Sequence, residues 1–264
     1  MILASSVEGR GDTPPIVLLH SLALDRSMWA SLATELSRDR IVIGLDLRGH
    51  GESPKQKSFS IEDMADDVAA TIDELGHDRA IVVGLSLGGC VAQAFAIRHP
   101  DRLAGLGLID TTAWYGPDAP ERWAERATKA RQQGMASLAQ FQLDRWFAAD
   151  FIDANRDEVE ALLQVFTAND IDSYAASCHA LGQFDARGNL GEIRAQTVVL
   201  VGELDPATPP EHARDLATRL PLASLHVLAG AKHLTPVELP GVVADLLSPL
   251  WADDAGQPMP GDRK

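Results

Sequence analysis

The chain has 264 residues, a length that suits one domain with an elaboration. Its 38 acidic residues against 23 lysines and arginines give a formal net charge of -15, which argues against nucleic acid or an anionic membrane as partner, because both repel an acidic surface. Two cysteines are too few for a disulfide framework, and neither a signal peptide nor a membrane-length apolar run is found, so we expect a cytoplasmic protein.

Short apolar runs alternate with helical patterns along most of the chain. The runs are continuously apolar, which is typical of strands in a sheet covered on both faces. The six predicted strands are residues 15–20, 40–46, 80–84, 103–110, 197–202 and 224–230. After the second strand, Ser60 is placed to cap a helix that Gly76 ends. The alternation predicts an α/β fold, with a mostly parallel central sheet flanked by helices.

The alternation breaks once, between residues 114 and 189. This segment has helical patterns and no convincing strand, and its four predicted helices are residues 120–134, 135–151, 156–170 and 172–185. Because ligands bind at the carboxyl ends of strands in such sheets, an all-helical insertion there would be a cap, or lid. We therefore expect a core made of residues 1–113 and 190–252, and a disordered tail over 253–264.

One serine lies between glycines directly after the third predicted strand, in "IVVGLSLGG". A strand that turns abruptly into a helix can hold the turn residue in a strained conformation with its side chain clear of the sheet. The positions two residues before and after it then come too close for side chains. Gly84 and Gly88 meet that demand around Ser86, so the stretch predicts a nucleophile elbow with an exposed, reactive hydroxyl.

A serine hydroxyl needs a base to take its proton, and neutral histidine is the usual base. His233 follows the last predicted strand, on a loop at the carboxyl edge of the sheet. His20 ends a strand at the same edge and is the competitor, while His50 lies in a turn after another strand. Chain order favours His233, since nucleophile, acid and base follow one another in this order at elbows of this kind.

The acid that orients the histidine is expected on a loop between the serine and the histidine. Asp205 follows a strand and precedes a proline-rich turn, which suits a fixed carboxylate. Glu203, nearer the strand, and Asp110, at the end of strand 103–110, are the alternatives. The oxyanion formed by attack would need two backbone donors, and the N–H groups of Leu87 and Leu22 are placed for that role.

With these parts in order, the chain resembles the α/β-hydrolase superfamily over nearly its whole length. The resemblance is carried by "LLHSLALDRSMW", "DLRGHGES", "GLSLGG", "GELDPATPP" and "KHLTPVE". Within the superfamily it is most similar to the 3-oxoadipate enol-lactonases, on "HSLALDRSMW", "ERATKARQQGMASLAQFQLDRWF" and "TANDIDSYAASCHAL". This implies a small lactone or ester as the partner, opened through an acyl-enzyme without a cofactor or metal.

Two other functions fit the same scaffold. One is a C–C bond hydrolase or a cofactor-free biosynthetic cyclase, and the other is a receptor that binds a lactone and turns over slowly. The chain also departs from the family pattern at three places. Ser21 stands where many members have glycine, Lys232 precedes the histidine, and the region before the first predicted strand is short. Nothing in the sequence indicates the oligomeric state.

An enol-lactone of the implied kind carries a carboxylate, which the negative charge of this chain opposes at long range. A local cation must then compensate, and Arg145 beside Trp146 offers a planar donor next to an aromatic wall. The alternative is that Arg145 pairs with Asp144 or Asp150 on the helix surface. The arginines of the preceding helix are weaker candidates for contact with the carboxylate, because helical spacing cannot point all of them inward. They are Arg122, Arg126 and Arg131.

Overall fold

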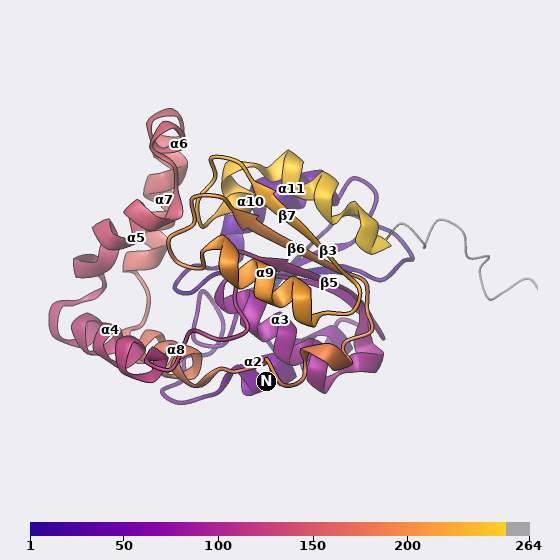
Figure 1. Ribbon diagram of the computed structural model, residues 1–264, viewed down its shortest axis with the longest axis horizontal. Coiled ribbons are helices and arrows are strands. Elements are labelled where there is room, and N and C mark those ends of the chain that lie inside the picture. Colours follow the sequence, from indigo (N-terminus) through magenta and orange to yellow (C-terminus); the bar gives the residue numbers. More distant parts are fainter. Residues whose placement is uncertain (252–264) are drawn as a thin grey trace, which may run out of the picture.

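A computed structural model describes residues 1–251, in which a seven-stranded sheet forms the centre of the molecule (Figure 1). The strand order is β1-β3-β2-β4-β5-β6-β7, and every neighbouring pair is parallel except β1, which runs antiparallel to β3. The strands are β1 Ser5–Glu8, β2 Ile16–Leu19, β3 Val42–Leu45, β4 Ala80–Leu85, β5 Leu103–Ile109, β6 Thr197–Gly202 and β7 Ala223–Leu228. The predicted α/β sheet is confirmed.

The strand β1 is the one that the sequence prediction omitted. Its four residues lie at the edge of the sheet. Two are half-buried and two are exposed, so the segment has no continuous apolar run that would indicate a strand. Five of the other six strands are continuously buried or nearly so, because helices cover both faces of the sheet. The helices of the core are α1 Ala30–Leu36, α2 Ile61–Glu74, α3 Leu87–Arg98, α9 Pro210–Arg219, α10 Thr235–Glu238 and α11 Pro240–Leu247.

The core helices pack in two groups. The helix α1 contacts α11, whereas α2 contacts α3 on the other side of the sheet (Figure 1). As predicted, Ser60 caps α2, and it does so in a reciprocal capping box with Asp63. Among residues 1–251, no helix has both the length and the apolar character needed to cross a bilayer.

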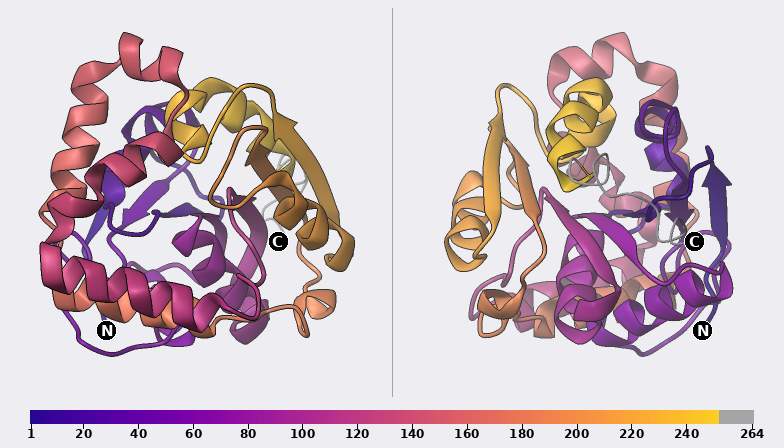
Figure 2. Two further views of the ribbon diagram at one scale, coloured as in Figure 1. Left: turned by 60° about the vertical axis from the view of Figure 1, so that its left-hand side comes forward. Right: turned by 90° about the vertical axis from the view of Figure 1, so that its right-hand side faces the viewer.

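Five further helices lie between β5 and β6 in the chain and gather on one side of the sheet (Figure 2). They are α4 Ala119–Gln133, α5 Ala139–Trp146, α6 Ala149–Ala154, α7 Arg156–Thr167 and α8 Ile171–Gln183, and α4 packs along α8. The insertion leaves and rejoins the core at one place, because Trp114 bridges to Asp185 and the N–H of Ala186 donates to the carbonyl of Ala113 at 3.0 Å. The expected boundaries of the cap, 114–189, stay a prediction.

The single helix predicted over 135–151 is wrong. The chain forms a 3-10 turn at Met135–Leu138, then α5, then α6, with extended backbone at Phe147. The reason is tertiary: the carbonyl of Trp146 accepts a hydrogen bond from the N–H of Leu234, and the N–H of Ala148 donates to Glu238. These backbone groups are therefore taken by another part of the chain. The tail predicted over 253–264 lies outside the described residues.

Candidate active site

Ser86 occupies the sharp turn between β4 and α3, with φ +55° and ψ −112°. The predicted steric demand on its neighbours is confirmed. A Cβ atom on Gly84 would lie 2.1 Å from the carbonyl oxygen of Gly88, and one on Gly88 would lie 2.0 Å from the carbonyl oxygen of Leu19. Both distances are far below any real carbon–oxygen contact, and both partners are backbone atoms, so only glycine fits at either position.

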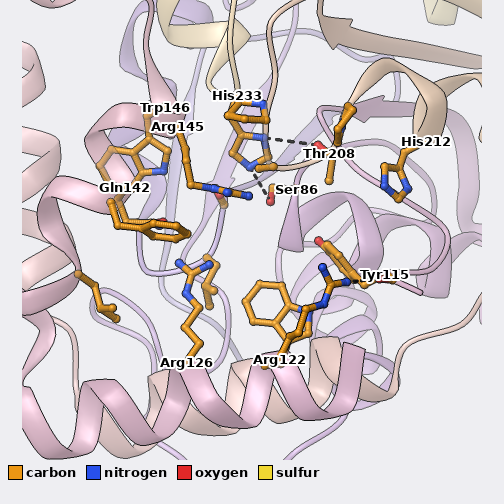
Figure 3. Close-up of a pocket in the computed structure, with 18 of the residues that line it drawn as sticks. Ser86, Tyr115, Arg122, Arg126, Gln142, Arg145, Trp146, Thr208, His212 and His233 are labelled. Carbon is orange, nitrogen blue, oxygen red and sulfur yellow. Dashed lines mark hydrogen bonds between the residues drawn. The ribbon is translucent and has the colours of Figure 1, made fainter. Parts of the chain in front are cut away.

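The three polar side chains selected from the sequence lie in one hydrogen-bonded line, of which Figure 3 shows the contact between His233 and Ser86. His233 Nε2 is 3.0 Å from Ser86 Oγ, and His233 Nδ1 is 2.8 Å from Asp205 Oδ2. Since an ionised carboxylate can only accept, Nδ1 carries the proton and Nε2 is left to accept from the serine hydroxyl. All three side chains are buried, so the expected exposure of the Ser86 hydroxyl is wrong: the elbow turns it into a cavity that the insertion covers. The structure thus brings together the nucleophile, base and acid that chain order indicates.

Asp205 is held as an anion. Burial disfavours its charge, but His233, the Thr208 hydroxyl at 2.7 Å and the Ala207 N–H at 2.7 Å outweigh burial and hold the pKa of Asp205 below its ordinary value. A hydrogen-bond acceptor fixed in this way keeps the imidazole in one tautomer and one orientation.

Asp110, the alternative acid, faces elsewhere. It is fully buried, and its carboxyl accepts from the N–H of Gly202 at 2.9 Å and from the N–H and hydroxyl of Thr235 at 3.1 and 2.7 Å. Burial, together with the negative charge of Asp205, raises its pKa well above the ordinary value. Asp110 therefore joins the end of β6 to the residue two positions after His233. Glu203, the other alternative, accepts from the N–H of Gly230 at 3.0 Å.

His20, the competing base, hydrogen-bonds the backbone on both ring nitrogens. Its Nε2 accepts from the N–H of Leu47 at 2.9 Å, and its Nδ1 donates to the carbonyl of Ser21 at 2.8 Å. That carbonyl shares a planar peptide unit with the N–H of Leu22, and a trans peptide points the two groups in opposite directions. By holding the carbonyl, His20 fixes the direction of the Leu22 N–H. The Leu87 N–H opens α3 and has no intrahelical acceptor.

A cavity of about 630 Å³ lies between Ser86 and the insertion (Figure 3). Core residues Ser21, Leu22 and His233 line one part, and Trp146, buried against Phe166, lines another. The charge of the cavity is opposite to that of the whole chain. One acidic residue, Glu125, lines it, against four basic ones: Arg122, Arg126, Lys129 and Arg145.

Arg145 points into the cavity and lies over the ring of Phe141, with 4.8 Å between its guanidinium carbon and the ring centroid. The surface pairing considered from the sequence is wrong: within residues 1–251 Arg145 forms no ion pair, and Asp144 accepts instead from Gln140. Burial, and then the positive charge of Arg126, lower the pKa of Arg145. It remains a cation, because a guanidinium is not deprotonated in proteins.

Several lining residues were not selected from the sequence. Gln142 is buried and faces the cavity three residues before Arg145, a spacing that places both on one helix face and could have indicated it. Tyr115 and His212 also line the cavity, and His212 is 2.6 Å from the Thr112 hydroxyl. Nothing in the sequence around His212 indicates a role at the site.

The segment that carries Arg145 is fastened to the loop that carries His233. Lys232 Nζ donates to the carbonyl of Asp144 at 2.7 Å, and the N–H of Leu234 donates to the carbonyl of Trp146 at 3.1 Å. Glu238 completes the connection, because one carboxylate oxygen accepts from the N–H of Ala148 and the other from the N–H of Lys232, both at 2.7 Å. We call residues 144–148 and 232–238 with these bonds the α5 clip.

The sequence profile of the alpha/beta hydrolase fold family matches residues 14–238, so the chain belongs to this family. It is similar to 3-oxoadipate enol-lactonase 2 of Acinetobacter baylyi, with 32% identity over 88% of this chain and 86% of the relative. Among solved structures, an enol-lactonase from Burkholderia xenovorans has 35% identity and a TM-score of 0.90 over 94% of this chain and 95% of its own. A thermophilic esterase from Thermogutta terrifontis has 34% identity and a TM-score of 0.86 over 92% and 90%.

The buried histidines at this edge predict how stability depends on pH. Burial lowers the pKa of His20 to about 4 and, helped by the charge of His20, that of His50 to about 3. Between pH 6.5 and 5 these two histidines therefore bind protons in the unfolded chain but stay neutral in the folded chain. The free energy of unfolding falls as pH falls. We expect a loss of about 1.5 kcal/mol per histidine over this window.

Urea unfolding at pH 7, 6.5, 6 and 5 measures this loss, in a range where most carboxylates stay ionised. His50→Gln should flatten the slope by the share of one histidine. A slope that stays the same in His50→Gln would show that His50 is charged in the folded protein.

Proposed function

We propose that this chain is a serine hydrolase that opens a small lactone or ester through an acyl-enzyme on Ser86. The observation that carries the proposal is the line of hydrogen bonds from Ser86 through His233 to Asp205, at the floor of a cavity large enough for a small molecule. The similarity to two enol-lactonases and an esterase supports the same class of reaction. No cofactor enters the proposed steps.

In the first half of the reaction, Ser86 Oγ attacks the carbonyl carbon of the substrate while His233 Nε2 takes the hydroxyl proton. The carbonyl oxygen becomes an oxyanion, which we assign to the N–H groups of Leu22 and Leu87. When the tetrahedral intermediate collapses, the ring C–O bond breaks and His233 returns its proton to the leaving oxygen. Asp205 stays ionised and stabilises the imidazolium that exists between these two transfers.

In the second half, water repeats the sequence on the acyl-enzyme. His233 takes a proton from water as its oxygen attacks the ester carbon, and the bond to Ser86 Oγ then breaks as the proton returns to the serine. The product is a carboxylic acid that keeps the former ring oxygen as a hydroxyl, or as a ketone when the ring oxygen belonged to an enol.

For the substrate we propose an enol-lactone or ester that carries its own carboxylate. Arg145 supplies a guanidinium without an ion-pair partner in the described chain, Trp146 an aromatic wall, and Ser21 a hydroxyl beside the oxyanion donors. The predominance of cations around the cavity supports an anionic ligand despite the charge of -15 on the whole chain. We further propose that the helices α4–α8 act as the lid over this ligand.

Ser86→Ala and His233→Ala should each abolish hydrolysis without unfolding the protein, because the side chains act as one unit. The double variant should be hardly worse than either single variant. The measurement is the initial rate with an enol-lactone, a saturated lactone and a simple ester, with circular dichroism as the check on folding. Near-normal turnover by Ser86→Ala would rule out the acyl-enzyme, and a burst that stalls in the native protein would favour a slow lactone receptor.

Asp205→Asn should lower kcat by roughly four orders of magnitude, because an amide cannot hold His233 in the productive tautomer. Asp110→Asn is the matched control, a second buried carboxyl at the same sheet edge that contacts Gly202 and Thr235 instead of the imidazole. It should cost stability and much less activity per folded molecule. If Asp110→Asn were the more damaging of the two for kcat, the assignment of the acid would be wrong.

Arg145→Leu should raise KM for an anionic lactone roughly tenfold to a hundredfold, the value of one charge-assisted contact of about 1.5 to 3 kcal/mol. Hydrolysis of a small neutral ester should stay nearly unchanged, because the hydrogen bonds among Ser86, His233 and Asp205 are not altered. Steady-state kinetics on both substrates give the comparison. Equal losses on the two would mean that the substitution disturbs the whole insertion, which contradicts a carboxylate contact.

A further inference from the structure

The helix α4 supplies a second arginine to the cavity. Arg126 is fixed by the Tyr174 hydroxyl, which accepts from its Nε at 2.6 Å. Its guanidinium carbon lies 5.1 Å from the ring centroid of Trp123 and 5.5 Å from that of Phe141. The Nη2 atom is buried and has no hydrogen-bond partner within residues 1–251. A buried guanidinium donor without an acceptor costs free energy, unless a ligand supplies the acceptor.

Arg126 and Arg145 share one aromatic side chain. The ring centroid of Phe141 is 4.8 Å from the guanidinium carbon of Arg145 and 5.5 Å from that of Arg126. Both guanidiniums face the cavity (Figure 3). No carboxylate of residues 1–251 forms an ion pair with either arginine, although Glu125 lines the same cavity. Their mutual repulsion contributes to the lowered pKa of Arg145, while Asp205 acts on Arg145 in the opposite direction.

Two like charges held close together without a counter-ion are unfavourable in a partly buried site. An anion between them, or one anionic group on each, removes that cost. Both guanidiniums contact the ring of Phe141, and the hydrogen bond to the Tyr174 hydroxyl holds Arg126 in this position. A ligand with two negative groups matches this arrangement better than a ligand with one.

We infer that Arg126 and Arg145 form a two-point anion site that binds short dicarboxylates, with one guanidinium for each carboxylate. The inference deepens the proposed function and rests on it for one consequence. Hydrolysis of a lactone that carries a carboxylate yields a dicarboxylate, so the reaction product would contact both arginines, whereas the substrate offers only one negative group. The site would then bind the product more tightly than the substrate, and release of the product would be slow.

The experiment uses the native full chain and two probes of equal length, glutarate and valerate, measured by isothermal titration calorimetry at low salt. Glutarate should bind at least tenfold more tightly than valerate, because it makes a second charge-assisted contact. Arg126→Gln should reduce the affinity for glutarate to that for valerate, and Arg126→Lys should restore part of it. Arg131→Gln, on the same helix but paired with Asp172 outside the cavity, should change neither affinity.

Equal affinities for the two probes in the native protein would overturn the inference, as would an unchanged affinity for glutarate in Arg126→Gln. Tyr174→Phe gives a second test that keeps the ring and removes only the hydroxyl that holds Arg126, and a loss of selectivity for glutarate is expected. Because neither probe is hydrolysed, these results do not depend on turnover. An inactive protein that binds glutarate through both arginines would contradict the proposed hydrolysis and leave the two-point site standing.

Discussion

The contact between Gly88 and the carbonyl group of Leu19 determines where the hydroxyl of Ser86 lies. It lets the first turn of α3 approach the end of β2 so closely that Ser86 must adopt a backbone conformation with φ +55°. Such a conformation costs about 1 to 3 kcal/mol for a residue with a side chain. Hydrogen bonds offset part of that cost, because the N–H of Ser86 donates to Ile109 and its carbonyl accepts from Thr111.

The electrostatics of the site follow from two buried carboxyl groups with opposite shifts. The pKa of Asp205 is lowered by His233 and the hydrogen bonds around it, whereas burial and the charge of Asp205 raise the pKa of Asp110. Two carboxyls whose pKa values are pushed apart can take different roles, and here one orients His233 while the other joins two loops.

Most of the line from Ser86 to Asp205 could be predicted, because glycine spacing and chain order are local or sequential properties. The sequence favoured Asp205 over Asp110 because a proline-rich turn follows it, but both residues follow parallel strands and therefore lie at one sheet edge. Only the direction in which each side chain hydrogen-bonds separates them. The sheet was predictable for the same reason, apart from β1, whose two half-buried and two exposed residues have no apolar pattern.

The insertion was harder to predict, because contacts between distant segments decide its details. The helix break before α6 depends on hydrogen bonds to Leu234 and Glu238, which lie more than eighty residues later in the chain. Arg126 was underrated because helical spacing on α4 shows which residues share a face but not which one meets Tyr174 on another helix. Periodicity identifies such helices, but tertiary packing decides which of their side chains face the cavity.

The α5 clip has a consequence for how a molecule enters the cavity. Its hydrogen bonds connect the backbone around Arg145 to residues on both sides of the base. A movement that carried α5 outward would pull Lys232 and Leu234 with it and would misalign His233 with Ser86. Opening by that route would therefore separate the imidazole from the serine hydroxyl. A movement of α4 and α8, which pack against each other and carry none of these hydrogen bonds, would leave the contact between His233 and Ser86 in place.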